Sequence, residues 1–198
     1  MIDEPAGPAN RLTYEAIWPS DLFTQGVGWV IFTRFKSAGR RAETGVFLID
    51  VFCLGAKFAV YEAGSTEDYR QRIRAHYVDQ FPMVSAEPCC ARKLVEQAAE
   101  YALRLGFAPH PDYRKTSRVF AGVQTCRCQQ GYTFGCQGKP FYRRGPRETE
   151  ARARSIIRQL QQRCGSGNFE YHVMLGSADQ INQSPFGPPL TCCARRWL

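Results

Sequence analysis

The apolar segment GVFLIDVFCLGAKFAVY, residues 45–61, contains one carboxylate, Asp50, and one thiol, Cys53. In an extended chain both faces of this segment are apolar, so both are expected to be buried. An isolated buried carboxylate costs several kcal/mol unless it is paired, hydrogen-bonded or protonated. We therefore predict that Asp50 is buried and held by a cation or by several backbone donors, with metal binding as the less favoured alternative. The candidate cations are Lys57, Arg34 and Lys36.

A nucleophilic cysteine would need a base within hydrogen-bonding distance and a positive environment. His110 is the best placed histidine by context, because it lies in a polar turn beside Asp112. Cys53, however, lies in an apolar strand, where cysteine usually behaves as a small hydrophobic residue. His110 followed by Pro111 and Asp112 is also typical of the start of a helix. The interpretation favoured here is structural, and Cys53 with His110 remains an alternative catalytic pair.

Three cysteines, Cys126, Cys128 and Cys136, form a second candidate site. Zinc sites commonly use two close pairs of thiols, each pair separated by two to four residues. Only one residue separates Cys126 from Cys128, and no second pair with suitable spacing follows. We predict that these three residues do not form a closed zinc site and that the protein needs no cofactor. The adjacent pairs 89–90 and 192–193 are not expected to converge on one ion.

Positive charges cluster between residues 114 and 158, and aromatic side chains lie among them. Phosphate groups need distributed cations, and unpaired bases stack on exposed aromatic or guanidinium planes. The pattern therefore favours contact with single-stranded nucleic acid or structured RNA over a merely solvated face neutralised by Glu148 and Glu150. The predicted contact residues are Arg114, Lys115, Arg118, Lys139, Tyr142, Arg143, Arg144, Arg147, Arg154 and Arg158.

The composition is that of a basic chain of 198 residues, with 26 Lys and Arg against 18 Asp and Glu and a net charge of +8. The first ten residues lack the apolar core of a secretory signal. No run approaches the roughly 18 apolar residues of a membrane-spanning helix. Nine cysteines without a signal peptide indicate reduced thiols. A soluble, cytoplasmic protein without membrane contact is expected.

The elements that must position these residues begin with three predicted strands. Residues 29–36 are β-branched and aromatic, residues 37–44 form a polar loop, and the apolar run from residue 45 continues past Gly55 into a strand at 57–61. A helix is predicted to begin near Ser65, where Glu67 and Asp68 supply an acidic first turn. The clearest helix runs from Pro88 to the stop at Gly106, and a shorter one runs from Pro111 toward residue 120.

In the second half, TFGCQGKPFY predicts a hairpin that turns at Gln137 and Gly138. Residues 147–164 predict an amphipathic helix, and the alternation in residues 168–175 predicts a half-buried strand. We expect an α+β fold with a largely antiparallel sheet, built from an N-terminal three-stranded meander, the later hairpin, a C-terminal strand, and three to four helices. A single domain is expected over residues 13–175, between a loose segment 1–12 and a disordered tail 176–198.

Three sequence blocks resemble an uncharacterised bacterial family. They are GVFLIDVFCLG at 45–55, LGFAPHPDY at 105–113 and FGCQGKPFYRRGP at 134–146. The resemblance implies a shared fold and a cytoplasmic bacterial origin, and it implies no activity. It also leads us to expect an acidic residue soon after Lys57, where this chain has Phe58, so no role of a second acid transfers to this protein.

Together these features favour a small cytoplasmic protein that binds nucleic acid, or acts as an accessory factor, without catalysis. A hydrolase or nuclease-like enzyme is the first alternative, using Asp50 with a metal or Cys53 with His110. A protein-interaction module is the second. Metal dependence would distinguish the enzyme, and steep salt dependence of polyanion binding would distinguish the first function.

Overall fold

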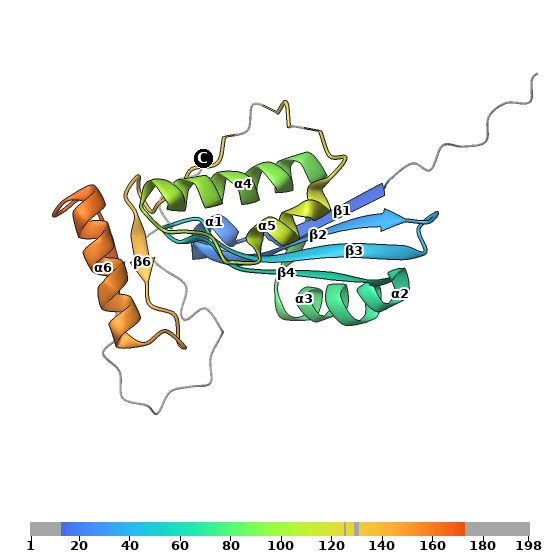
Figure 1. The fold of residues 1–198 in the computed structure, drawn as a ribbon, viewed down its shortest axis with the longest axis horizontal. Helices are drawn as coiled ribbons and strands as arrows, with labels where there is room; N and C mark the ends of the chain where they lie inside the picture. Colours follow the sequence, from blue (N-terminus) through green and yellow to red (C-terminus); the bar gives the residue numbers. More distant parts are fainter. Residues whose placement is uncertain (1–12, 125, 129–130, 173–198) are drawn as a thin grey trace, which may run out of the picture.

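The computed structural model describes residues 13–124, 126–128 and 131–172, and these form a mixed α+β fold that confirms the predicted class. Five antiparallel strands make the main sheet, in the order β4-β3-β2-β1-β5 (Figure 1). These strands are β1 (Thr13–Pro19), β2 (Val27–Lys36), β3 (Arg41–Asp50), β4 (Gly55–Ser65) and β5 (Met83–Ala86). The short helix α1 (Leu22–Gln25) joins β1 to β2.

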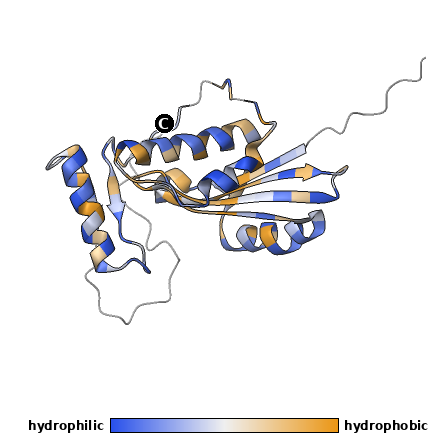
Figure 2. Ribbon diagram, viewed as in Figure 1, coloured by the Kyte–Doolittle hydropathy of each residue, from blue (hydrophilic) through white to orange (hydrophobic). Residues whose placement is uncertain are grey.

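Helices cover both faces of the sheet (Figure 1). One face carries α4 (Pro88–Arg104), α5 (Tyr113–Thr116) and the 3-10 turn η2 (Ser117–Phe120). The opposite face carries a continuous helical segment made of α2 (Thr66–Asp68), the π-helix η1 (Tyr69–Arg74) and α3 (Ala75–Gln80). Polar and apolar residues alternate around α4, as Figure 2 shows, because only one side of the helix packs on the strands.

Small residues let α4 approach the sheet closely. Ala91, Ala98 and Ala102 are fully buried on its inner stripe together with Leu94 and Val95, as the sequence pattern predicts. Gly55 at the start of β4 has a φ of +61°, and a Cβ there would lie 2.5 Å from the carbonyl oxygen of Ala98. Glycine is required at this position for both its backbone conformation and its lack of a side chain.

The second helical segment begins at a capping box, which confirms the start predicted at Ser65. The Ser65 hydroxyl accepts a hydrogen bond from the Asp68 backbone N–H, and the Asp68 carboxylate accepts one from the backbone of Ser65. Tyr69 follows and is buried against Ile17 and Ile31 of the sheet. The helix therefore starts where local hydrogen bonding and burial agree.

The C-terminal part of the described chain forms a smaller unit at one end of the sheet (Figure 1). Its two strands, β6 (Phe141–Arg143) and β7 (Glu170–His172), pair in parallel, and α6 (Glu150–Cys164) connects them. Apolar side chains of this unit pack with residues that follow β3 and α4. The shared cluster contains Tyr142, Ala153, Ile156 and Leu160 together with Cys53, Leu54, Ala102, Leu105 and Phe107.

The predicted meander is confirmed as β2, β3 and β4, but its hairpin loop is shorter than expected. Strand β3 already begins at Arg41, which pairs with Lys36, so the prediction of a loop over residues 37–44 is wrong in its second half. Polar residues continue the strands because they find partners there: the buried hydroxyls of Thr33 and Thr44 hydrogen-bond to each other, and Glu43 pairs with Arg34 and Lys36. Strands β1 and β5 were not predicted.

The hairpin turn at Gln137 and Gly138 is present. Both residues have positive φ angles, and Cys136 and Lys139 exchange two backbone hydrogen bonds across the turn. The following strand, β6, pairs with β7 instead of extending the hairpin. The predicted strand over residues 168–175 corresponds to β7, and residues 173–175 lie outside the described residues. The predictions for residues 1–12, 176–198 and the pair 192–193 also lie outside them.

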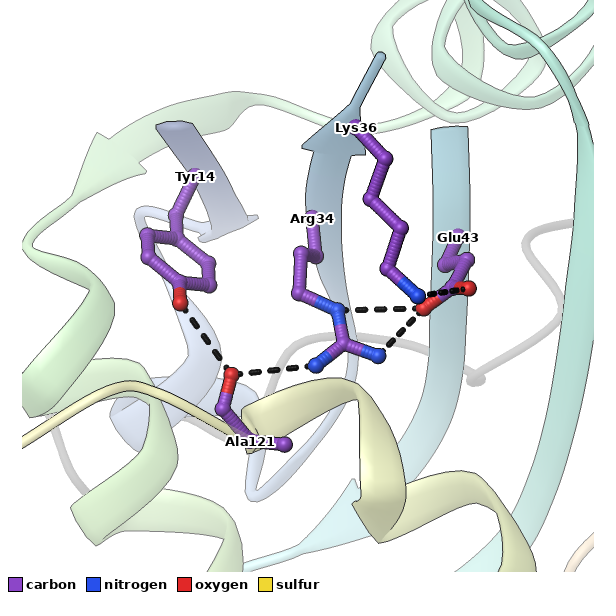
Figure 3. A network of polar contacts seen from close by, with 5 residues as sticks. All are labelled: Tyr14, Arg34, Lys36, Glu43 and Ala121. Atoms are coloured by element: carbon purple, nitrogen blue, oxygen red, sulfur yellow. Dashed lines mark hydrogen bonds and ion pairs between the residues drawn. The ribbon is translucent and has the colours of Figure 1, made fainter. Parts of the chain in front are cut away.

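A polar network fastens the end of η2 to the sheet (Figure 3). The carbonyl oxygen of Ala121 accepts hydrogen bonds of 3.1 Å from the Tyr14 hydroxyl and from Nη1 of Arg34. Arg34 and Lys36 also form ion pairs with Glu43 on the neighbouring strand. Burial would raise the pKa of Glu43, but the hydrogen bonds from Lys36 and Arg34 outweigh it, and the pKa lies below its ordinary value of 4.5.

We expect Glu43→Gln to lower the free energy of unfolding at pH 7 by about 1–3 kcal/mol, because it leaves two partly buried cations without a counter-charge. A carboxylate with a lowered folded pKa stabilises the protein above the unfolded pKa and loses this effect as the pH falls below 4.5. The difference between variant and parent should therefore shrink in acid urea titrations. Glu170→Gln, at an exposed position, is the matched control, and equal behaviour of the two variants would contradict the role of Glu43.

Candidate functional site

Asp50 is buried at the end of β3, where it caps a tight turn. Its Oδ1 accepts hydrogen bonds from the backbone N–H groups of Phe52, at 3.0 Å, and Cys53, at 2.8 Å. The turn residues 51–54 are themselves buried, so their polar backbone groups need partners inside the protein. The carboxylate supplies acceptors for two of them.

Other segments satisfy the remaining groups of this turn. The N–H of Val51 donates to the carbonyl of Gly26, and the carbonyl of Val51 accepts from the N–H of Gly135. The carbonyl of Phe52 accepts from the N–H of Phe141 at the start of β6. The buried turn therefore joins the end of α1, the hairpin and the C-terminal unit.

The prediction that Asp50 is buried and held by several backbone donors is confirmed. Burial raises the pKa of Asp50, while the nearby charge of Lys57 and the backbone donors oppose this shift. Of the three candidate cations, Lys57 is the one that acts electrostatically on Asp50, whereas Arg34 and Lys36 bind Glu43. At least one carboxylate oxygen of Asp50, Oδ1, therefore has a structural role as a hydrogen-bond acceptor.

Cys53 and His110 do not form a catalytic pair in the described part of the chain. Burial raises the pKa of the Cys53 thiol, and the charge of Asp50 raises it further, which disfavours a thiolate. The His110 ring contacts Phe58, with centroids 5.1 Å apart, and its Nδ1 accepts a hydrogen bond of 3.2 Å from the N–H of Asp112. Among the described residues no hydrogen bond joins the thiol to the imidazole, so the nucleophilic alternative loses its geometric basis.

The basic residues of the hairpin region are largely engaged within the protein. Arg143 donates to the carbonyl of Gln25, at 3.1 Å, and Arg144 donates through Nε to the carbonyl of Glu148, at 2.9 Å. Tyr142 is 0% exposed, and its hydroxyl donates to Glu148 Oε2. The prediction that Tyr142 stacks on a base is therefore corrected: the ring belongs to the core between β6 and α6.

Lys139 is exposed but reaches back into the fold. Its ammonium group donates to the carbonyl of Gly167, at 2.9 Å, in the segment that leads to β7. Like Arg144, it joins two parts of the C-terminal unit to one another, whereas Arg143 joins this unit to α1. The first role of these three cations is therefore to stabilise the fold through hydrogen bonds to backbone carbonyls.

The arginines of α6 are arranged differently. Thr149 caps the helix by accepting from the N–H of Arg152, and the helix then buries an inner stripe made of Ala153, Ile156 and Leu160. The arginines project beside and away from this stripe. The exposed arginines of α6 and the segment before it are Arg147, Arg152, Arg154, Arg158 and Arg163.

Only one of these arginines has an ion-pair partner in the part of the chain that the structure describes. Arg154 pairs with Glu150 one turn earlier, and both side chains are largely exposed. Arg154 and Arg158 lie one helical turn apart on one flank of the buried stripe, and Arg152 and Arg163 lie on the other flank. Their guanidinium groups are available to an external anion.

Arg114, Lys115 and Arg118 are also exposed, but they belong to a different surface. They lie on α5 and η2, which pack against the middle of the main sheet, whereas α6 lies at its end (Figure 1). The structure therefore divides the predicted basic region into two surfaces. The larger number of exposed arginines is on α6 and the segment before it.

Tyr171 is an exposed aromatic residue beside this basic unit that the sequence pattern did not identify. Its side chain is 54% exposed on β7, and its ring stacks on Phe169 with centroids 6.2 Å apart. The alternation of residues 168–175 predicted that Tyr171 faces inward. No simple pattern signals its exposure, because β7 is a three-residue strand without a covered face.

The structure brings Cys126 and Cys128 to Cys89 and Cys90 at the start of α4. The sulfur atoms of Cys89, Cys90 and Cys126 all lie within 4.8 Å of one another, so the adjacent thiols of the pair 89–90 do lie close together. Cys136, the third predicted candidate, is buried elsewhere in the core beside the hairpin turn. The long loop before the hairpin makes this arrangement possible by folding back over α4.

Comparisons of the chain with protein-family models, curated proteins and solved structures give no match. The resemblance of the three sequence blocks to a bacterial family stays a prediction. Within the described residues, none of the helices is both long enough and apolar enough to span a bilayer.

We expect Asp50→Ala to lower the free energy of unfolding by about 2–4 kcal/mol, because it leaves two buried N–H groups without an acceptor. Asp50→Asn retains a carbonyl oxygen at this position and should cost less. Asp79→Ala, at an exposed position of α3, is the control and should stay within about 0.5 kcal/mol of the parent. Urea denaturation measures all three, and an Asp50→Ala variant as stable as the parent would show that the turn does not need its carboxylate.

Proposed function

We propose that the protein binds nucleic acid, with single-stranded or structured RNA as the favoured ligand, through the exposed arginines of α6. The observation that supports this proposal is that several exposed arginines flank the buried stripe of α6. Within the described chain most of these arginines have no ion-pair partner. No catalytic step is part of the proposal. The protein would act as a binding or accessory factor in a reducing cytoplasm.

The chemistry of the cations supports phosphate as the contacted group. Guanidinium groups bind phosphate oxygens through two parallel hydrogen bonds and also stack on bases. Arg154 and Arg158, one turn apart, flank the apolar side chain of Ile157, and the three together line a shallow hollow. Such a surface combines charge with an apolar floor, which suits a sugar-phosphate backbone with unpaired bases.

Tyr171 replaces Tyr142 as the proposed stacking residue. It is exposed on β7, next to His172, whose carbonyl accepts a hydrogen bond of 3.1 Å from the N–H of Arg144 in the segment after β6. A base stacked on Tyr171 would therefore lie beside the unit that carries the arginines. Arg143 and Arg144 then contribute by holding β6 in place and not by direct contact.

The enzymatic alternatives have weaker support. Asp50 uses one carboxylate oxygen to cap a buried turn, and the Cys53 thiol is fully buried with a raised pKa. Neither residue lines the hollow on α6 or the one between β4 and the helical segment that follows it. For a protein-interaction module, the described residues offer exposed apolar side chains on several different elements, among them Phe23, Val84 and Leu103.

The test is the salt dependence of binding to a fluorescent single-stranded RNA. For the parent protein, affinity should fall steeply with salt, with a log–log slope of about −0.7 per phosphate contact on single strands. The double variant Arg154→Gln, Arg158→Gln should reduce the magnitude of this slope by about 1.4, because two contacts are lost. The double variant Arg114→Gln, Arg118→Gln carries the same charge change on the other surface and should leave the slope unchanged.

Tyr171→Ala separates stacking from charge. It should weaken binding by about 1–3 kcal/mol with little change in slope, because stacking releases few counterions. Tyr142→Phe should instead lower stability, since it removes the hydroxyl that donates to Glu148. A folded parent protein that binds neither RNA nor single-stranded DNA at low salt would refute the proposed function. Equal effects of the two double arginine variants on the slope would show that binding is a non-specific electrostatic attraction and not a contact with α6.

A further inference from the structure

Four thiols gather where the loop that follows η2 crosses the start of α4. The Sγ atom of Cys90 lies 3.3 Å from that of Cys126 and 3.4 Å from that of Cys128, and the latter two lie 2.6 Å apart. Cys89 completes the group, within 4.8 Å of Cys90 and Cys126. We propose that these four cysteines bind one zinc ion that fixes the loop to the helix.

The distances suit a tetrahedral thiolate site. With Zn–S bonds of about 2.3 Å, the sulfur atoms of a tetrahedral site lie roughly 3.8 Å apart. The separations of Cys90 from Cys126 and Cys128, 3.3 and 3.4 Å, are slightly shorter than this value. The sulfur atoms of Cys89 and Cys128 are farther apart than 4.8 Å, so one of these two side chains must turn toward the other when the ion binds. The thiols of Cys126 and Cys128 are closer than uncharged sulfur atoms pack, and a shared ion would hold them apart at the bonded distance.

The position of the group at a helix start also favours ionised sulfur. Cys89 and Cys90 occupy the first turn of α4, directly after Pro88, and α4 is 17 residues long. The positive end of the helix dipole stabilises negative charge there, and it opposes the burial and the neighbouring thiols that raise the pKa of Cys90. Thiolates are the form in which cysteine binds zinc.

The loop has few other restraints. Within its described residues it contains no helix or strand between η2 and the bridge at Cys136. Three side-chain hydrogen bonds join it to α4: Arg92 donates to the carbonyl of Val123, Lys93 donates to the carbonyl of Cys128, and Tyr132 donates to the carbonyl of Cys90. All three contacts join the loop to the first turns of α4, around the thiols.

A metal serves this arrangement better than a disulfide. Cys90 is within 3.4 Å of both Cys126 and Cys128, so any one disulfide among these residues leaves a thiol in the same small space without a partner. Four thiolates on one ion use every sulfur atom and close the coordination shell. A closed shell leaves no position for substrate, so the proposed role of the zinc is structural.

The consequence for the fold is that the loop becomes a fixed surface. Tyr132 in this loop stacks on Phe23, with centroids 5.6 Å apart, and meets Trp18 edge to face at 6.3 Å. The zinc would therefore also hold aromatic residues against β1 and α1. This role is independent of nucleic-acid binding by α6, which lies elsewhere on the protein.

Elemental analysis of the full chain, purified under reducing conditions without added metal, should find one zinc per protein. Cobalt(II) loaded after zinc removal should give the intense visible bands of a tetrahedral thiolate site. Cys90→Ser and Cys128→Ser should each lose the bound zinc and these bands, whereas Cys164→Ser, a partly buried cysteine at the end of α6, should retain both. Zinc removal should increase proteolysis between residues 121 and 135 while the main sheet stays folded.

Zinc-free protein whose cobalt complex lacks thiolate bands would overturn the proposal, even if the protein is folded. So would a disulfide between Cys90 and Cys126 in protein alkylated at lysis, because it would show that oxidation and not metal joins the loop to α4. Retention of zinc in both Cys90→Ser and Cys128→Ser would place the metal at other residues. Failure of RNA binding alone leaves these outcomes unaffected.

Discussion

The structure depends on one buried turn whose backbone must be satisfied without water. Residues 51–54 lie between β3 and β4 in the interior, and their backbone groups bond both to the neighbouring Asp50 and to three distant segments. Asp50 bonds two of their N–H groups, Gly26 and Gly135 reach Val51, and Phe141 reaches Phe52. The ends of α1, the hairpin and β6 therefore have fixed positions relative to the main sheet. Asp50, which is a candidate catalytic residue in the sequence, therefore has a structural role: it stabilises the turn on which three other segments pack.

The need to satisfy backbone carbonyls also separates the basic side chains into two groups: those that bond such carbonyls and those that are exposed to solvent. Arg143, Arg144 and Lys139 donate to backbone carbonyls: Arg144 and Lys139 join parts of the C-terminal unit, and Arg143 joins this unit to α1. Within the described residues the arginines of α6 make no hydrogen bond to a backbone carbonyl, and they are exposed on a helix whose inner stripe is apolar. Neighbours in the sequence thus differ in role because one set lies where the chain turns and the other lies on the outside of a packed helix.

Local patterns identified the parts of the fold that rest on local physics. The stripe of α4, the cap at Ser65 and the apolar surroundings of Asp50 are readable because periodicity and capping act within a few residues. Strand β5 has only four residues and pairs with distant β1, so no alternation could reveal it. The thiol cluster joins Cys90 to Cys126 across 36 positions, and its geometry depends on how a long loop folds back. Spacing rules derived from compact zinc motifs do not apply to such a site.

The unit made of β6, α6 and β7 has a consequence for how the chain folds during synthesis. Its core includes four residues from the part of the chain that is synthesised earlier: Cys53, Leu54, Leu105 and Phe107. These side chains stay uncovered until α6 has been synthesised and packs on them. A nascent chain ending before residue 150 would present an apolar face beside an otherwise complete sheet. Such a surface is a binding site for chaperones and a site of aggregation. The unit of β6, α6 and β7 therefore covers an apolar surface that the earlier part of the chain leaves exposed.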